Sequence, residues 1–131
     1  MNNKKLGIAF EKLLCELLAK KGYWVHFIEP KKDGSQPFDV IAVKDDVPIA
    51  IDCKTLSDKI NWFRFERLEY NQIMAFDKWM LCGNKTAMIA VLWKNAIYFI
   101  QYYDLITQHR IDMRTLEGFE IDEETRQKYN L

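Results

Sequence analysis

The sequence predicts an α/β protein in which a mixed central sheet is flanked by helices. Segments with apolar residues at helical spacing alternate with segments rich in β-branched and aromatic residues. Some neighbouring strands are separated by only two to five polar residues, whereas others have a helical segment between them. Short turns give antiparallel pairs and helical crossovers give parallel pairs, so we expect both kinds of pairing in one sheet.

The predicted elements follow the order α-β-β-β-α-β-β. A first helix is expected from about residue 5 to residue 21, where apolar residues recur every three or four positions and Gly22 follows as a helix-ending residue. A second helix is expected from about residue 65 to residue 81, before Cys82-Gly83-Asn84. Strands are expected at residues 23–28, 38–43, 49–54, 86–93 and 96–103. Beyond residue 104 the pattern weakens to a short helical turn and an acidic end.

The length and composition indicate one soluble domain. The chain has 131 residues, 49% of them hydrophobic, so we expect a single domain over residues 1–131, with a core at about 5–105 and a C-terminal extension at 106–131. Nineteen basic and nineteen acidic residues exclude a polycation but leave room for a local basic patch.

The sequence also limits the partners and the cellular compartment. Three scattered cysteines favour a reducing, cytoplasmic environment. No secretory signal and no apolar run of about 18 residues are found, so no membrane partner is expected. The absence of a P-loop or a glycine-rich dinucleotide turn argues against a nucleotide cofactor.

Asp39, Asp52 and Lys54 are the first candidate site residues. Asp52 and Lys54 lie two positions apart on one predicted strand, so they share a face of the sheet. Asp39 opens the preceding strand, and a hairpin places it beside Asp52. Two adjacent carboxylates repel each other, and a hard divalent cation such as Mg²⁺ would relieve the repulsion. The alternative is a surface salt bridge between Lys54 and one of the aspartates.

Glu11 and Gln72 extend this candidate site from the two helices. Glu11 lies at the border of the apolar stripe of the first helix and could lean toward the aspartates, or it is a solvated glutamate. Gln72 falls within the apolar stripe of the second helix, where a buried amide needs hydrogen-bond partners. It is either a satisfied core glutamine or a residue at the edge of a polar site.

A polar loop and several lysines are candidates for DNA contact. The alternative is that these residues form an ordinary turn and a solvated surface. The candidates are Ser35, Gln36, Lys31, Lys32 and Lys12.

These residues resemble the PD-(D/E)XK nuclease superfamily. Glu11, the Pro-Phe-Asp sequence ending at Asp39, and the (D/E)XK element Asp52-Cys53-Lys54 carry the resemblance, and the predicted order matches its restriction-endonuclease-like αβββαβ core. Gly7-x-x-Phe10-Glu11, residues 34–36 and Gln72 further resemble Holliday-junction resolvases of the RecU and Hjc types.

The resemblance implies a metal-dependent endonuclease that hydrolyses DNA phosphodiesters and resolves four-way junctions in recombination and repair. It implies Mg²⁺, replaceable by Mn²⁺, held by Asp39, Asp52, the Cys53 backbone carbonyl and, directly or through water, Glu11. Lys54 would position the attacking water and Gln72 would support the site. A homodimer acting on branched DNA is implied as well.

Two alternatives remain open from the sequence. The same site could serve a structure-specific or restriction-type nuclease that acts on flaps, nicks or duplex DNA. The fold could also serve a non-catalytic DNA-binding module, although carboxylates near phosphates are of no use to a protein that only binds DNA.

Overall fold

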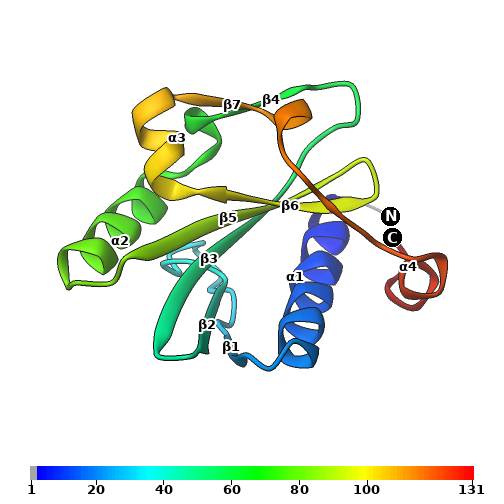
Figure 1. Ribbon diagram of the computed structural model, residues 1–131, viewed down its shortest axis with the longest axis horizontal. Coiled ribbons are helices and arrows are strands. Elements are labelled where there is room, and N and C mark those ends of the chain that lie inside the picture. The colour runs from blue at the N-terminus through cyan, green and yellow to red at the C-terminus, as the bar shows by residue number, and fades with distance from the viewer. Residues whose placement is uncertain (1–2) are drawn as a thin grey trace.

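The computed structural model describes residues 3–131, and its centre is a six-stranded sheet in the order β1-β2-β3-β5-β6-β8 (Figure 1). A separate two-stranded ribbon joins β4 and β7. The helical and strand elements, with two 3-10 helices named η, follow in chain order. They are α1 (Asn3–Lys20), β1 (Trp24–Phe27), β2 (Val40–Lys44), β3 (Val47–Thr55), β4 (Trp62–Arg64), η1 (Phe65–Arg67), α2 (Tyr70–Leu81), β5 (Thr86–Trp93), β6 (Ala96–Gln101), α3 (Tyr102–Gln108), β7 (Arg110–Asp112), η2 (Met113–Thr115), β8 (Phe119–Glu120) and α4 (Glu123–Tyr129).

The sheet is mixed, which confirms the predicted fold class. Neighbouring strands are antiparallel except for β3 and β5, which are parallel and are connected through α2. The β2–β3 hairpin turns at Asp45 and Asp46, and the β5–β6 hairpin turns at Lys94 and Asn95. All four turn residues have positive φ values of 49–66°, the backbone conformation that a two-residue hairpin with the natural strand twist requires.

Two apolar clusters hold the helices against opposite faces of the sheet. Phe10, Leu13 and Leu14 of α1 are almost fully buried in one cluster, which also contains Ile51 of β3. The other cluster packs α2, α3 and the β4–β7 ribbon against Ala50 and its neighbours. Because side chains alternate along a strand, β3 presents Ile51 to α1 and the next residue, Asp52, to α2.

The second helix begins later than predicted. Residues 62–67 form β4 and η1 instead, and α2 starts only at Tyr70. Phe63 is fully buried and pairs with Ile111 of β7, so the contact with a distant strand prevails over the local helical pattern. Leu68 is extended (ψ 137°), and the N–H of Glu69 donates to Gln72 Oε1 at 3.0 Å, which satisfies the first turn of α2.

The C-terminal segment contributes more structure than the sequence predicts. The short helical turn expected from residue 104 is confirmed as α3, but it begins earlier, at Tyr102, so β6 ends at Gln101 instead of residue 103. Beyond it, β8 extends the sheet next to β6. Helix α4 lies beside α1, where Lys128 and Tyr129 donate hydrogen bonds to Glu16. Across residues 3–131, every helix is too short or too polar to cross a membrane.

Candidate active site

Three carboxyl groups from different elements, Glu11 of α1, Asp39 before β2 and Asp52 of β3, lie close enough to interact electrostatically. Asp39 directly precedes β2, and its backbone N–H donates to the carbonyl of Ile51 at 3.0 Å. Its side-chain Oδ2 accepts a 2.7 Å hydrogen bond from the N–H of Cys53. This bond draws the Asp39 carboxylate across to β3, next to Asp52, as the hairpin argument predicts. Glu11 of α1 adds a third carboxyl group that interacts with Asp39.

Asp52, Lys54 and Gln72 form a hydrogen-bonded network on the α2 side of the sheet. Asp52 is fully buried, and its Oδ1 accepts a 2.7 Å hydrogen bond from Gln72 Nε2. Lys54 Nζ lies 3.1 Å from Asp52 Oδ2 and donates to Gln72 Oε1 at 3.1 Å. The predicted shared face of Asp52 and Lys54 is therefore confirmed, and the surface salt bridge is excluded because Asp52 is inaccessible to solvent. Gln72 combines its two predicted alternatives, since it is buried with its amide satisfied and its partners include Asp52 and Lys54.

The site carries more negative charge than its own cation neutralises. Burial, the charge of Asp39 and a hydrogen bond to it raise the pKa of Glu11 to about 7, while Lys54 acts in the opposite direction. Burial and Asp39 also raise the pKa of Asp52 well above its usual value, again against Lys54. Within residues 3–131, the buried atoms Glu11 Oε2 and Asp52 Oδ2 have no hydrogen-bond donor. Glu11 Oε2 remains available to a cation, whereas Asp52 Oδ2 already has the Lys54 ammonium 3.1 Å away.

The loop between β1 and β2 is attached to the start of α2. Asn71 Nδ2 donates to the carbonyls of Gly34 and Gln36 at 3.1 and 3.0 Å, and Gln36 Oε1 accepts from the N–H of Lys31. Sequence reasoning missed Asn71, and its position beside Gln72 at the start of α2 is the only signal that could have found it.

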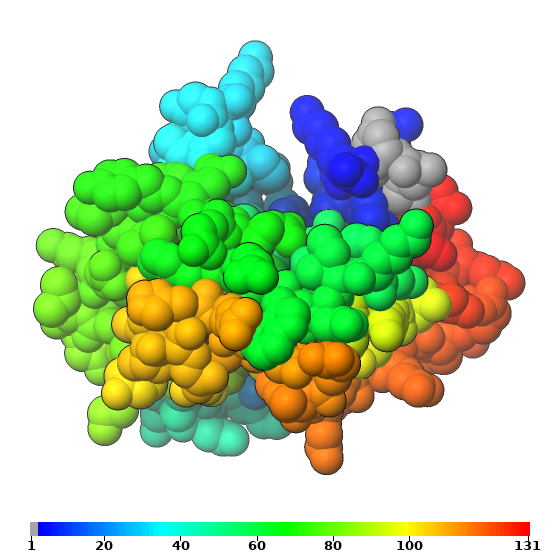
Figure 2. Space-filling view, turned by 90° about the horizontal axis from the view of Figure 1, so that it is seen from above, coloured from blue at the N-terminus to red at the C-terminus, as the bar shows by residue number. Residues whose placement is uncertain are grey.

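The candidate DNA-contacting residues come from the β1–β2 loop and from α1. The β1–β2 loop (cyan) and the N-terminal turns of α1 (blue) project at the same edge of the view in Figure 2. Lys31, Lys32 and Ser35 are exposed on the loop, where Gln36 is half-buried, and Lys12 is exposed on α1.

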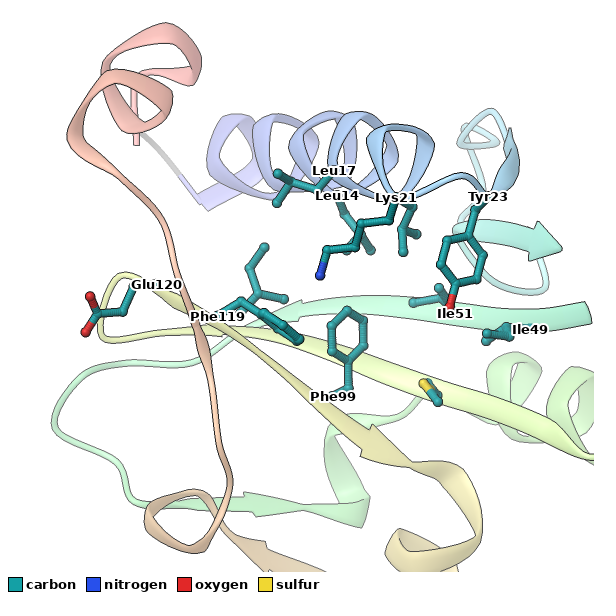
Figure 3. A pocket seen from close by; sticks show the side chains of 12 residues that line it. Leu14, Leu17, Lys21, Tyr23, Ile49, Ile51, Phe99, Phe119 and Glu120 are labelled. Atoms are coloured by element: carbon teal, nitrogen blue, oxygen red, sulfur yellow. The ribbon is translucent and has the colours of Figure 1, made fainter. Parts of the chain in front are cut away.

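A separate apolar pocket of about 430 Å³ lies under the C-terminal half of α1 (Figure 3). Leu14, Leu17, Ile51 and Phe99 line it, together with Lys21 near its rim. None of the three clustered carboxylates contributes to its wall. It is therefore distinct from the candidate active site.

The fold and the acidic cluster with its lysine define a nuclease of the PD-(D/E)XK superfamily. The family model described as archaeal Holliday junction resolvase (Hjc) matches residues 2–130, and the chain belongs to this family. The structure is similar to Hjc, a Holliday junction resolvase from the archaeal hyperthermophile Archaeoglobus fulgidus, with a TM-score of 0.60 and 21% sequence identity over 92% of this chain and 98% of that chain. The search among curated proteins gave no match.

Family membership confirms the predicted resemblance and the predicted function. The chain is a nuclease that acts on DNA and resolves Holliday junctions. Its family generally uses divalent metals.

Proposed function

We propose that this chain resolves four-way junctions by Mg²⁺-dependent hydrolysis at the cluster of Glu11, Asp39 and Asp52. The observation that carries this proposal is the group of three interacting carboxyl groups with a single paired lysine, in which the buried Glu11 Oε2 has no hydrogen-bond partner within residues 3–131. Carboxylates in such surroundings repel each other, and a divalent cation provides the positive charge that the site lacks.

Asp39, Asp52 and the Cys53 carbonyl are the proposed protein ligands of Mg²⁺, with Mn²⁺ as a substitute. Among residues 3–131 no group of three or more His, Cys, Asp or Glu side chains is arranged to hold a metal ion by itself. An open arrangement suits Mg²⁺, which commonly binds proteins through one or two carboxylates and keeps several waters. Glu11 holds the ion directly or through one of those waters. Bound Mg²⁺ supplies positive charge that polarises the scissile phosphate and acidifies a water.

Lys54 and Gln72 are proposed to act together on the water and the phosphate. Lys54 Nζ is held at a fixed place by Asp52 Oδ2 and Gln72 Oε1, both at 3.1 Å. An ammonium group in a fixed position can orient the attacking water and stabilise charge that develops on the phosphate. Gln72 contributes by keeping the side chains of Asp52 and Lys54 in place, since it is hydrogen-bonded to both of them.

The DNA is proposed to enter between the β1–β2 loop and α1. Five residues would contact its phosphates through charge or hydrogen bonds. They are Lys12, Lys31, Lys32, Ser35 and Gln36.

Two copies of the chain are proposed to act together, because a four-way junction must be cut in two strands and has approximate two-fold symmetry. Tyr70, Met74 and Leu81 support a second copy at α2. These apolar side chains are 77%, 52% and 84% exposed, and their spacing places them on one side of the helix.

Cleavage of a labelled four-way junction tests the proposal. Wild type and Asp52→Asn are compared with Mg²⁺, Mn²⁺ or EDTA, alongside a matched linear duplex and a flap. Asp46→Asn is the matched control, because Asp46 is exposed in the β2–β3 turn and asparagine tolerates its φ of 66°.

We expect paired, symmetric nicks in the junction that disappear with EDTA and with Asp52→Asn but persist with Asp46→Asn. Preferential cutting of the flap or duplex would replace junction resolution by another nuclease activity. Tight binding without any cutting would indicate a DNA-binding module.

A further inference from the structure

The β4–β7 ribbon and the 3-10 helices that follow its strands form a second basic surface. Four of the chain's five arginines lie here, in two segments that are far apart in the sequence. Residues 59–67 and 109–115 contain five lysines and arginines against two acidic residues, whereas the whole chain has a net charge of zero. The positive charge is therefore concentrated by the pairing of β4 with β7. The four arginines are Arg64, Arg67, Arg110 and Arg114.

Arg64 and Arg110 lie directly opposite each other in this ribbon, and both are exposed. Like charges at directly opposite positions weaken an antiparallel pair. Phe63 and Ile111, the neighbouring pair, are buried on the other face, so the register is held by the core. The repulsion between the two arginines thus destabilises the ribbon, and both side chains lie on its solvent-exposed face.

The charges of three arginines are not neutralised within the described part of the chain. Arg114 pairs with Asp112 at 2.9 Å, but Arg64, Arg67 and Arg110 make no ion pair with any carboxylate in residues 3–131. These three side chains, defined here as the arginine triad, are free to bind an anion from outside.

Two members of the triad are held in place by aromatic rings and by the backbone. The Arg110 guanidinium carbon lies 4.3 Å from the centre of the Trp62 ring, and that of Arg67 lies 5.5 Å from the Phe63 ring. Stacking keeps a planar guanidinium oriented, which reduces the entropy lost when it binds a phosphate through two hydrogen bonds.

The triad is also connected to the candidate active site. Arg67 Nη2 donates a 2.8 Å hydrogen bond to the carbonyl of Thr55, the residue that follows Lys54 on β3. In the view of Figure 2, the green atoms of the β4–η1 region are seen on the same face as the β1–β2 loop and the N-terminal turns of α1. Arg67 therefore lies beside the end of β3 that follows Lys54.

We propose that Arg64, Arg67 and Arg110 bind the phosphodiester backbone of a duplex arm as it leaves the active site. This inference rests on the proposed junction cleavage and adds a contact surface to it. Phosphates on a duplex arm suit the triad because they are regularly spaced anions outside the reacting centre, and arginine binds them without reading the base sequence.

Binding of a fluorescent four-way junction and of its linear arm over a range of salt concentrations tests this proposal. EDTA is present so that no strand is cut. Arg64→Gln, Arg110→Gln and the double variant are compared with Lys85→Gln, a control at an exposed position between α2 and β5. Each lost phosphate contact should lower the slope of log affinity against log salt by about 1, and the double variant by about 2. The control should match wild type.

Arg64→Glu separates a DNA contact from a structural role. It converts the repulsive cross-strand pair with Arg110 into an attractive one, so the melting temperature should rise while junction affinity falls. A structural role alone would make stability and affinity change in the same direction.

Unchanged affinity and salt slope in the double variant would overturn the proposal. A different result would contradict the proposed catalytic site. In that case Asp52→Asn would continue to cut the junction, and the binding measured for the triad variants would not affect this conclusion. Weaker binding by the triad variants together with loss of cutting in Asp52→Asn supports both inferences.

Discussion

Gln72 Nε2 donates a 2.7 Å hydrogen bond to Asp52 Oδ1, which joins the first turn of α2 to a fully buried carboxylate on β3. The same side chain accepts from Lys54 Nζ and from the N–H of Glu69 through Oε1. One amide thus satisfies the start of a helix and fixes two charged groups of the candidate active site. Substitutions at this position can separate the two roles.

Gln72→Ala should lower both stability and cleavage. The substitution leaves Asp52 Oδ1 and the Glu69 N–H without their partners, at a cost of about 1–3 kcal/mol for each buried group left unpaired. Gln72→Glu can still accept from the Glu69 N–H but places a carboxylate against Asp52, so cleavage should fall more than stability does. Urea unfolding and junction cleavage measure the two effects. Gln108→Ala, at an exposed position of α3, is the control and should change stability by less than about 0.5 kcal/mol.

Lys54→Met should abolish most of the cleavage while leaving junction binding largely intact. Without the ammonium, the attacking water loses the group proposed to orient it, and we expect the single-turnover rate at saturating protein to fall by about 10²–10³-fold. Lys85→Met provides a matched loss of charge at an exposed position between α2 and β5. A rate for Lys54→Met within a few-fold of wild type would remove Lys54 from the mechanism.

The metal-free protein should become less stable as the pH rises from about 4.5 to about 7. The pKa of Glu11 is 4.5 in the unfolded chain and is raised to about 7 in the folded one, chiefly by burial, so the folded state holds the proton more tightly. The stabilisation from that proton is complete below pH 4.5 and is lost as the pH passes about 7. Asp52, whose pKa is also raised, acts in the same direction.

Urea unfolding in EDTA between pH 4 and pH 8 measures this dependence, and Glu11→Gln should make it shallower. Mg²⁺ should stabilise the protein more at pH 8 than at pH 5, because protons and cation compete for the same carboxylates. A pH profile that is identical for wild type and Glu11→Gln would show that Glu11 does not titrate in this range.

Asn71→Ala should loosen the β1–β2 loop without affecting the chemistry. The substitution removes both hydrogen bonds that attach the loop to α2, at Gly34 and Gln36. We expect faster proteolysis of the loop and weaker junction binding, with near-normal cleavage once the junction is saturated. Asn84→Ala is the comparison, since Asn84 donates a similar amide hydrogen bond, to the Trp79 carbonyl, at the far end of α2. Equal effects of the two variants would argue against a specific role for the loop attachment.

Met74→Glu and Leu81→Glu should convert a dimer into a monomer. Both side chains are largely exposed in the single chain, so the substitutions should spare the fold but place charge within the proposed contact of two copies. Sedimentation velocity would detect the change in mass, with Lys94→Glu in the β5–β6 turn as the control. A wild-type protein that sediments as a monomer at every concentration would contradict this arrangement.

The sequence predicted the arrangement of the candidate site residues because their positions follow from local periodicity. Alternation along β3 was enough to place Asp52 and Lys54 on one face. The short hairpin was enough to bring Asp39 beside Asp52, and helical spacing placed Gln72 toward the sheet. Asp52 and Lys54 lie in one strand, and Asp39 and Asp52 belong to two consecutive strands. The position of Gln72 depends on an apolar stripe of its helix that must face the core.

Local periodicity in the sequence did not predict the contacts between distant segments. Residues 62–67 have an apolar pattern that fits a helix, yet Phe63 pairs with Ile111 in a ladder that only the folded chain creates. The attachment of the loop by Asn71 and the opposition of Arg64 and Arg110 depend likewise on how remote segments pack.

The sequence by itself determined the order of the main helices and strands, the face on which each buried residue lies, and the identity of the acidic residues and their lysine, since these depend on spacing along the chain. Only the tertiary structure decided where α2 begins, that β8 completes the sheet, and that β4 meets β7 to concentrate the arginines. The physical reason is that burial of side chains such as Phe63 between distant elements contributes more to stability than local propensity does, and no local pattern records which partner will bury them.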